Sequence, residues 1–169
     1  MVEQIITDLE YIAADAAGKE EENDHFLQFV RRQDGQALDE RVHRINTAVS
    51  AAIDCTACGN CCQKLVVNIT KDEIAGLATY LGKTVAEVND AYIEESLGGQ
   101  CFINSVPCHF LGDKKCNIYS ARFTECRDFP HLHKNGFKER FLGTLLHYGG
   151  CPIIYNVVEQ LKRETGFVE

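Results

Sequence analysis

The sequence predicts a mainly α-helical (α+β) fold: a helical domain with a small β-hairpin and an irregular, cysteine-rich metal-binding centre. Three observations lead to this prediction. Apolar residues recur at helical spacing near both ends of the chain, short apolar pieces between turn residues fill the middle, and all nine cysteines lie between residues 55 and 151. With 169 residues, one hydrophobic core can form without covalent help, so residues 1–169 are expected to fold as a single domain.

The N-terminal part of the chain carries three helix signals. Over residues 1–17, apolar side chains at i, i+3, i+4 and i+7 form one helical face, and Gly18 provides a stop signal. The acidic stretch that follows is expected to be a solvated link to a short helix capped by Asn23 or Asp24. A third helix, over residues 36–52, leads directly into a cysteine-rich loop.

Two capping boxes follow this loop. Residues 64–69 indicate a short strand, and after them Thr70 with Glu73 and Thr84 with Glu87 each have the spacing of a capping box. In such a box the threonine hydroxyl and the glutamate carboxylate satisfy each other's backbone amides. Two short helices are therefore expected.

The remaining chain divides into short pieces and a last helix. Residues 98–130 suggest a small hairpin with Gly112 and Asp113 near its turn, and Pro152 occupies a first helical position. We therefore divide the chain into an N-terminal helical segment (1–53), a cysteine-cluster metal-binding region (54–152) and a C-terminal helix (153–169).

Charge and hydropathy argue against two classes of partner. The net charge is −8, from 25 acidic and 17 basic residues, and no Lys/Arg run stands out to follow a phosphate backbone, so nucleic acid is not an expected partner. No apolar stretch approaches the roughly 20 residues that span a bilayer, and the first residues carry acids where a signal peptide carries bases. We expect a cytoplasmic protein without a membrane segment.

The stretch CTACGNCC contains four cysteines, Cys55, Cys58, Cys61 and Cys62. In a reducing compartment thiols rarely persist as structural disulfides, and an odd number of cysteines leaves one unpaired, so metal binding is the leading interpretation. Two cysteines three residues apart can turn both thiolates toward one ion. Gly59 is expected to supply a positive φ, which a tight loop around a metal needs.

Five more cysteines follow at wider intervals. Cys108, Cys116, Cys126 and Cys151 are further candidate ligands, whereas Cys101 lies between apolar neighbours and is expected to be an ordinary buried thiol.

The cysteine pattern resembles a known family. CTACGNCC, then CHFL, then CNIYSARFTECRDFP, is similar to the YkgJ-type cysteine-cluster family, whose members are described as zinc- or iron-chelating domains. Its pattern is CxxCGxCC followed by CxFL, CxIYxxRPxxCRxFP and often a later CP, and the resemblance covers about residues 55–152. One departure is Phe123, which stands where the family has proline in the local turn. The resemblance implies functional roles for Cys55, Cys58, Cys61, Cys62, Cys108, Cys116, Cys126 and Cys151, together with Tyr119, Arg122, Arg127 and Pro130.

Two kinds of metal centre fit this ligand set. Eight thiolates could hold two zinc ions, each with four sulfurs. An iron–sulfur cluster commonly takes three ligands from one CxxCxxC run, here Cys55, Cys58 and Cys61, and a fourth from a distant Cys-Pro, here Cys151. The run favours the cluster, and zinc stays open as the alternative. Arg122 and Arg127 are candidates to balance the negative charge of the thiolates.

Two functional hypotheses follow from different classes. The first is a metal-binding module whose centre is structural and whose surface binds a protein partner. The second is a redox or protein-modifying enzyme, because a flagellin lysine methylase resembles the same family. No recognised catalytic motif is present, and the CxxxCxxC signature of radical S-adenosylmethionine enzymes is absent, so catalytic residues stay unassigned.

Overall fold

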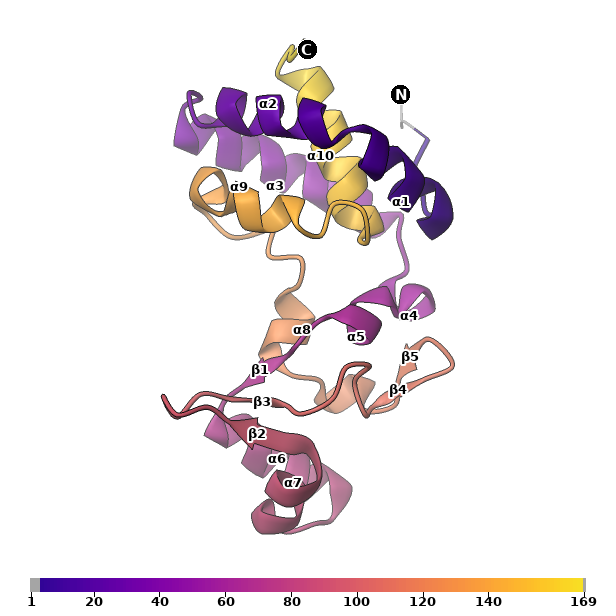
Figure 1. The fold of residues 1–169 in the computed structure, drawn as a ribbon, viewed down its shortest axis with the longest axis vertical. Coiled ribbons are helices and arrows are strands. Elements are labelled where there is room, and N and C mark those ends of the chain that lie inside the picture. Colours follow the sequence, from indigo (N-terminus) through magenta and orange to yellow (C-terminus); the bar gives the residue numbers. More distant parts are fainter. Residues whose placement is uncertain (1–3, 169) are drawn as a thin grey trace. The chain divides into compact units, whose positions relative to one another are not determined.

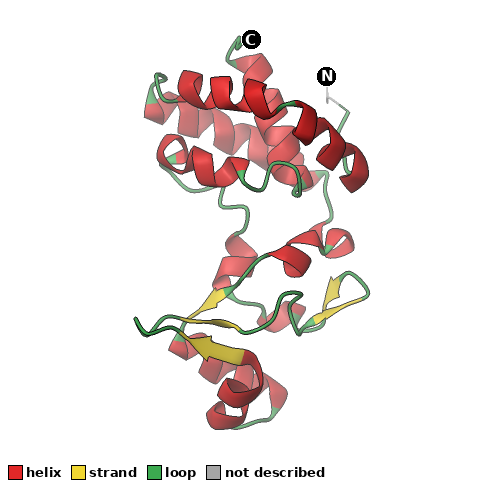
Figure 2. Cartoon of the chain, viewed as in Figure 1, coloured by secondary structure: helices red, strands yellow, loops and turns green. Residues whose placement is uncertain are grey.

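The computed structural model describes residues 4–168 and confirms a mainly α fold with two small antiparallel sheets (Figures 1 and 2). The chain forms two compact units. Residues up to Asp54 combine with those from Pro130 onward in what we call the helical unit, and Cys55–Phe129 form the cysteine-rich unit. Residues 130–152, grouped above with the cysteine region, thus belong to the helical unit.

Within the described residues, the helical unit contains five helices. They are α1 (Leu9–Gly18), α2 (Glu20–Val30), α3 (Gly35–Ala51), α9 (Phe137–Leu145) and α10 (Pro152–Glu164). Helix α3 packs against both α9 and α10, while α2 contacts α9 and α1 contacts α10. Their apolar faces meet in a core in which Ile12, Phe26, Val42, Phe141 and Leu161 are fully buried. The last helix has its proline in the first turn, as expected.

Two predictions about the N-terminal helices are wrong. Helix α1 begins at Leu9, because the Asp8 carboxylate accepts hydrogen bonds from two amides of the first turn. The predicted helix is therefore wrong over residues 4–8, and its first three residues lie outside the described part. The solvated link and its caps are also wrong, since only Lys19 separates α1 from α2, and Asn23 and Asp24 lie inside α2. The acidic residues instead form the first turn of α2, where the helix dipole favours negative charge.

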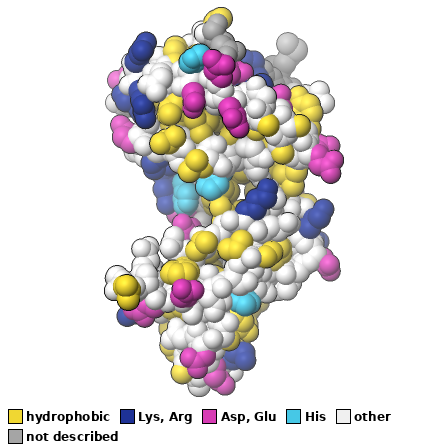
Figure 3. Space-filling model, viewed as in Figure 1, with side chains coloured by type: hydrophobic (Ala, Val, Ile, Leu, Met, Phe, Trp, Pro, Cys, Tyr) yellow, Lys and Arg dark blue, Asp and Glu magenta, His cyan; other side chains and the backbone are white. Residues whose placement is uncertain are grey.

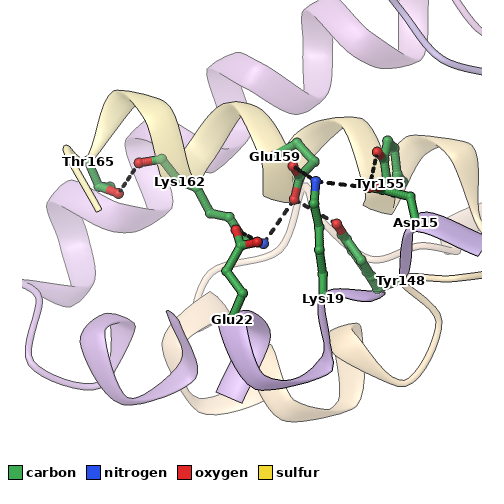
Figure 4. A network of polar contacts seen from close by, with 8 residues as sticks. All are labelled: Asp15, Lys19, Glu22, Tyr148, Tyr155, Glu159, Lys162 and Thr165. Atoms are coloured by element: carbon green, nitrogen blue, oxygen red, sulfur yellow. Dashed lines mark hydrogen bonds and ion pairs between the residues drawn. The ribbon is translucent and has the colours of Figure 1, made fainter. Parts of the chain in front are cut away.

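A polar network joins α1, α2 and α10 within the helical unit (Figure 4). It includes Asp15, Lys19, Glu22, Tyr148, Tyr155, Glu159 and Lys162. The Lys162 ammonium is buried and lies 2.8 Å from a Glu22 carboxylate oxygen and 2.9 Å from one of Glu159. Burial would raise the pKa of Glu159, but hydrogen bonds from Lys19, Tyr148 and Lys162 hold it below its usual value. These charges are mutually satisfied, so the network has a structural role in the helical unit.

The cysteine-rich unit contains short helices and strands. They are α4 (Cys55–Cys58), α5 (Asn60–Lys64), β1 (Asn68–Ile69), α6 (Lys71–Leu81), α7 (Val85–Tyr92), β2 (Ile93–Glu95), β3 (Cys101–Ile103), β4 (Leu111–Gly112), β5 (Lys115–Cys116), a 3₁₀ turn (Tyr119–Ala121) and α8 (Thr124–Asp128). Strand β3 lies between β1 and β2, with Ile69 opposite Cys101 and Ile93 opposite Ile103. Strands β4 and β5 form the predicted hairpin.

Local signals in this unit differ in how well they predict structure. Both predicted capping boxes are present, at the starts of α6 and α7. The strand predicted over residues 64–69 is correct only for its last two residues, because Lys64 ends α5 and β1 is only as long as its pairing with β3 allows. Cys101 is buried in the core of the unit, as expected, beside residues such as Ile74, Leu77 and Ile103.

Surface charges are mixed on the face that Figure 3 shows. Lys and Arg side chains are dispersed there among acidic and apolar ones. No helix in the described part of the chain combines the length and apolar character needed to cross a bilayer.

Candidate metal centre

The CTACGNCC segment forms two single helical turns, α4 and α5, joined by Gly59. Cys55 and Cys58 are the first and last residues of α4, while Cys61 and Cys62 lie in α5. Cys55 and Cys61 are exposed, whereas Cys58 and Cys62 are half-buried. Gly59 has a φ of 60°, which confirms the positive φ expected there.

Gly59 also lets the cysteine loop approach the β4–β5 hairpin. A Cβ atom at Gly59 would lie 2.8 Å from both the carbonyl carbon and the Cα of Lys114, and closer still to the carbonyl oxygen. Real Cβ atoms essentially never come this near to backbone. Lys114 is in the turn of the hairpin, and Cys116 lies on its second strand. Only glycine therefore permits this contact between CTACGNCC and the segment that carries Cys116.

Backbone hydrogen bonds link Cys108 both to the CTACGNCC segment and to the β4–β5 hairpin. Its amide donates to the Cys62 carbonyl at 2.8 Å, and its own carbonyl accepts from the Leu111 amide at 3.1 Å. Leu111 in turn pairs with Cys116 across the hairpin. The main chain thus holds Cys62, Cys108 and Cys116 on neighbouring segments.

Cys126 lies in α8, which two carboxylates hold in place. The Thr124 amide donates to the Glu73 carboxylate at 2.7 Å, and the Asn68 amide donates to the Glu125 carboxylate at 2.9 Å. Sequence reasoning identified Glu73 only as a capping residue and missed Glu125. Their partners are 51 and 57 residues away, so no local pattern indicates these contacts.

The thiols of this unit influence one another electrostatically. A hydrogen bond from the Cys62 thiol lowers the pKa of Cys61, although atoms around its sulfur partly desolvate it and oppose this shift. The Cys62 thiol donates this hydrogen bond, and the bond and burial together raise the pKa of Cys62. The nearby thiols of Cys108 and Cys116 raise it further. Burial raises the pKa of Cys126 to about 12, with further contributions from Cys108, Cys61 and Cys116. Each added thiolate therefore makes the next one costlier, and a bound cation would reverse this effect.

The donor set fits a thiophilic metal. Within residues 4–168, no three His, Cys, Asp or Glu side chains stand in an arrangement that would hold a metal ion as placed. The fit rests instead on chemistry: five mutually interacting thiols come from CTACGNCC, the hairpin region and α8. Cys108, Cys116 and Cys126 pack against the apolar core, where thiolates without a cation would be poorly solvated.

Arg122 and Arg127, which are predicted to balance the thiolate charge, contact residues close to them in the sequence. The Arg122 guanidinium carbon lies 3.8 Å from the centroid of the Tyr119 ring. Arg127 donates to the Arg122 carbonyl at 2.5 Å and to the Thr124 hydroxyl at 2.9 Å. Both arginines thus organise the segment around Cys126, and a direct effect on the thiolates stays a prediction.

Cys151 lies in the helical unit, where it precedes the first residue of α10. Its amide donates to the His147 carbonyl at 2.9 Å, and its carbonyl accepts from the Tyr155 amide at 2.9 Å. Its role as a remote ligand stays a prediction, as do the ligand roles of the other seven cysteines. Pro130, which the resemblance also marks, is the first residue of the second part of the helical unit.

Thiols on CTACGNCC, the hairpin region and α8 are the feature of a cysteine-cluster, metal-chelating class of domain. A family model named CxxCxxCC, described as "Putative zinc- or iron-chelating domain", matches residues 54–144. The chain belongs to this family, which confirms the resemblance based on its motifs. Cys151 lies beyond the matched residues. Comparison with curated proteins gave no match, and comparison with solved structures gave none either.

Proposed function

We propose that the cysteine-rich unit binds a thiolate-ligated metal centre that ties CTACGNCC to the β4–β5 hairpin and to α8. The observation that carries this proposal is the close approach of Gly59 to Lys114, together with the Cys108 amide bonded to the Cys62 carbonyl. These contacts bring together thiol-bearing segments that are about 50 residues apart in sequence. The proposed ligands come from the thiols of this unit, Cys55, Cys58, Cys61, Cys62, Cys108, Cys116 and Cys126. The sequence-based assignment of Cys151, in the helical unit, stays a prediction.

The proposed centre is structural, because the elements that carry the thiols are too short to be stable alone. Helices α4, α5 and α8 span four or five residues each, and the hairpin strands span two. Metal binding to such a site contributes directly to folding, by about 10 kcal/mol or more in small zinc domains. Loss of the metal is therefore expected to loosen the loop, the hairpin and α8 together.

An iron–sulfur cluster is the centre we propose, with zinc as the alternative. Cys55, Cys58 and Cys61 have the CxxCxxC spacing that supplies three cluster ligands, and they lie in one continuous α4–Gly59–α5 segment. A fourth thiolate would come from the neighbouring segments of the same unit, which carry Cys108, Cys116 and Cys126. The adjacent Cys62 is not part of that run. It would be a zinc ligand if the eight thiols were shared between two zinc ions.

Anaerobic purification of the full chain, followed by an absorption spectrum and elemental analysis, tests this proposal. We expect brown protein that contains iron and acid-labile sulfide. Colourless protein with stoichiometric zinc would replace the cluster by the zinc alternative and keep the metal-binding function. Protein that contains neither metal would contradict the proposed function itself.

A further inference from the structure

The two capping boxes of the cysteine-rich unit are alike in their local contacts. One carboxylate oxygen of Glu73 accepts from the Thr70 amide and hydroxyl at 2.9 and 3.1 Å. The equivalent oxygen of Glu87 accepts from the Thr84 amide and hydroxyl at 2.7 and 2.8 Å. Glu73 differs because its other oxygen accepts the Thr124 amide at 2.7 Å, 51 residues further along the chain.

Thr124 is the first residue of α8, two positions before Cys126. A five-residue helix has too few internal hydrogen bonds to hold itself, so external contacts decide where α8 lies. Those contacts include the Glu73 carboxylate on the Thr124 amide, the Glu125 carboxylate on β1, and the burial of Phe123 just before the helix. The Glu73 contact joins α6 to the first residue of α8.

We propose that Glu73 is a positioning residue of the metal centre, which sets the Cys126 thiol against the thiols of Cys61, Cys108 and Cys116. This inference rests on the proposed function. Glu73 does not touch the metal; it acts through the amide of Thr124. Loss of hydrogen-bond partners that orient a ligand typically weakens metal binding about 10- to 100-fold.

The charge state of Glu73 agrees with this role. Burial would raise its pKa, but hydrogen bonds from Thr124 and Thr70 hold the pKa below its usual value. The side chain is therefore a carboxylate near neutral pH and accepts both contacts at once.

The test measures how fast the purified, metal-bearing full chain releases its metal to excess EDTA under anaerobic conditions. Thr124→Pro removes the amide that donates to Glu73, and proline is well tolerated at the first position of a helix. The residue before it, Phe123, has φ −66° and ψ 156°, a conformation that a following proline favours. Thr124→Ala is the matched control, because it keeps this amide and loses only the hydroxyl, which accepts from Arg127 and also bonds to Glu73. The difference between the two variants therefore isolates the amide contact.

A second pair of variants acts on the acceptor. Glu73→Ala loses both contacts, whereas Glu87→Ala loses only a capping box. We expect metal release from Thr124→Pro and Glu73→Ala to be about 10- to 100-fold faster than from the wild type. Thr124→Ala and Glu87→Ala should stay close to the wild-type rate, and far-UV circular dichroism checks that each variant is folded.

Equal release rates for Thr124→Pro and Thr124→Ala would overturn the inference even if Glu73→Ala failed to fold. Equal rates for Glu73→Ala and Glu87→Ala would overturn it as well. In both cases a metal-bearing wild type leaves the proposed function intact. A wild-type protein that carries no metal overturns the proposed function and, with it, the role of Glu73.

Discussion

Replacement of Gly59 by alanine is expected to separate the cysteine loop from the β4–β5 hairpin and to reduce bound metal. Two effects add at this position. The left-handed conformation at φ 60° costs about 1–2 kcal/mol for a residue with a Cβ, and forcing that atom against the Lys114 backbone adds about 1–3 kcal/mol. The free energy of unfolding should therefore fall by about 2–5 kcal/mol. Denaturant unfolding of the purified variant measures this loss, and elemental analysis measures the metal.

Gly82→Ala is the matched control for this prediction. Gly82 follows the last residue of α6 and has a φ of 64°, also left-handed, but a Cβ there would meet nothing within 4 Å. Its replacement should cost only the conformational part, about 1–2 kcal/mol, and leave the metal content unchanged. If the two variants lost equal stability and equal metal, the contact between Gly59 and Lys114 would have no role in the centre.

Replacement of Cys58 by serine is expected to lower bound metal and thermal stability together. Cys58 ends α4, which contacts β5 in the hairpin. Loss of a ligand should weaken metal binding by at least the roughly 10- to 100-fold that loss of an orienting hydrogen bond costs. Because metal binding contributes to folding, the melting temperature should fall with the metal content. Elemental analysis and a thermal melt of the same sample measure both quantities.

Cys101→Ala is the control, because Cys101 is buried in β3 and is expected to be a spare thiol. Its removal leaves a small gap in the core and should destabilise the protein while its metal content is unchanged. Unchanged metal and melting in Cys58→Ser would remove Cys58 from the ligand set. Loss of metal from Cys101→Ala would show that Cys101 had been wrongly excluded.

Local signals in the sequence were sufficient to predict several structural elements. The Thr–Glu capping boxes, the hairpin turn and the Pro152 helix start each depend on residues close together in the chain, and the structure confirms all three. Helix α9, over Phe137–Leu145, was not predicted, although Phe137 and Phe141 have helical spacing. It begins after Gly136, which offers no side chain to cap it, so the usual start signal is missing.

The site was predictable in its residue types and less so in its geometry. The cysteine motifs alone led to the correct family, because thiol spacing is itself the functional signal. The contacts that assemble the site were not predictable, since the Gly59–Lys114 approach and the Glu73–Thr124 bond join residues about 50 positions apart. Such pairings depend on the tertiary fold, which no short pattern encodes.

The central claim is that cysteine sulfurs from separate segments hold one metal centre. X-ray absorption at the metal edge of the anaerobically purified full chain tests this most directly, because it reports which atoms surround the metal. The account predicts a shell of sulfur atoms around the metal, at about 2.3 Å if the metal is zinc. A metal surrounded only by oxygen and nitrogen, or a chain that carries no metal, would contradict it.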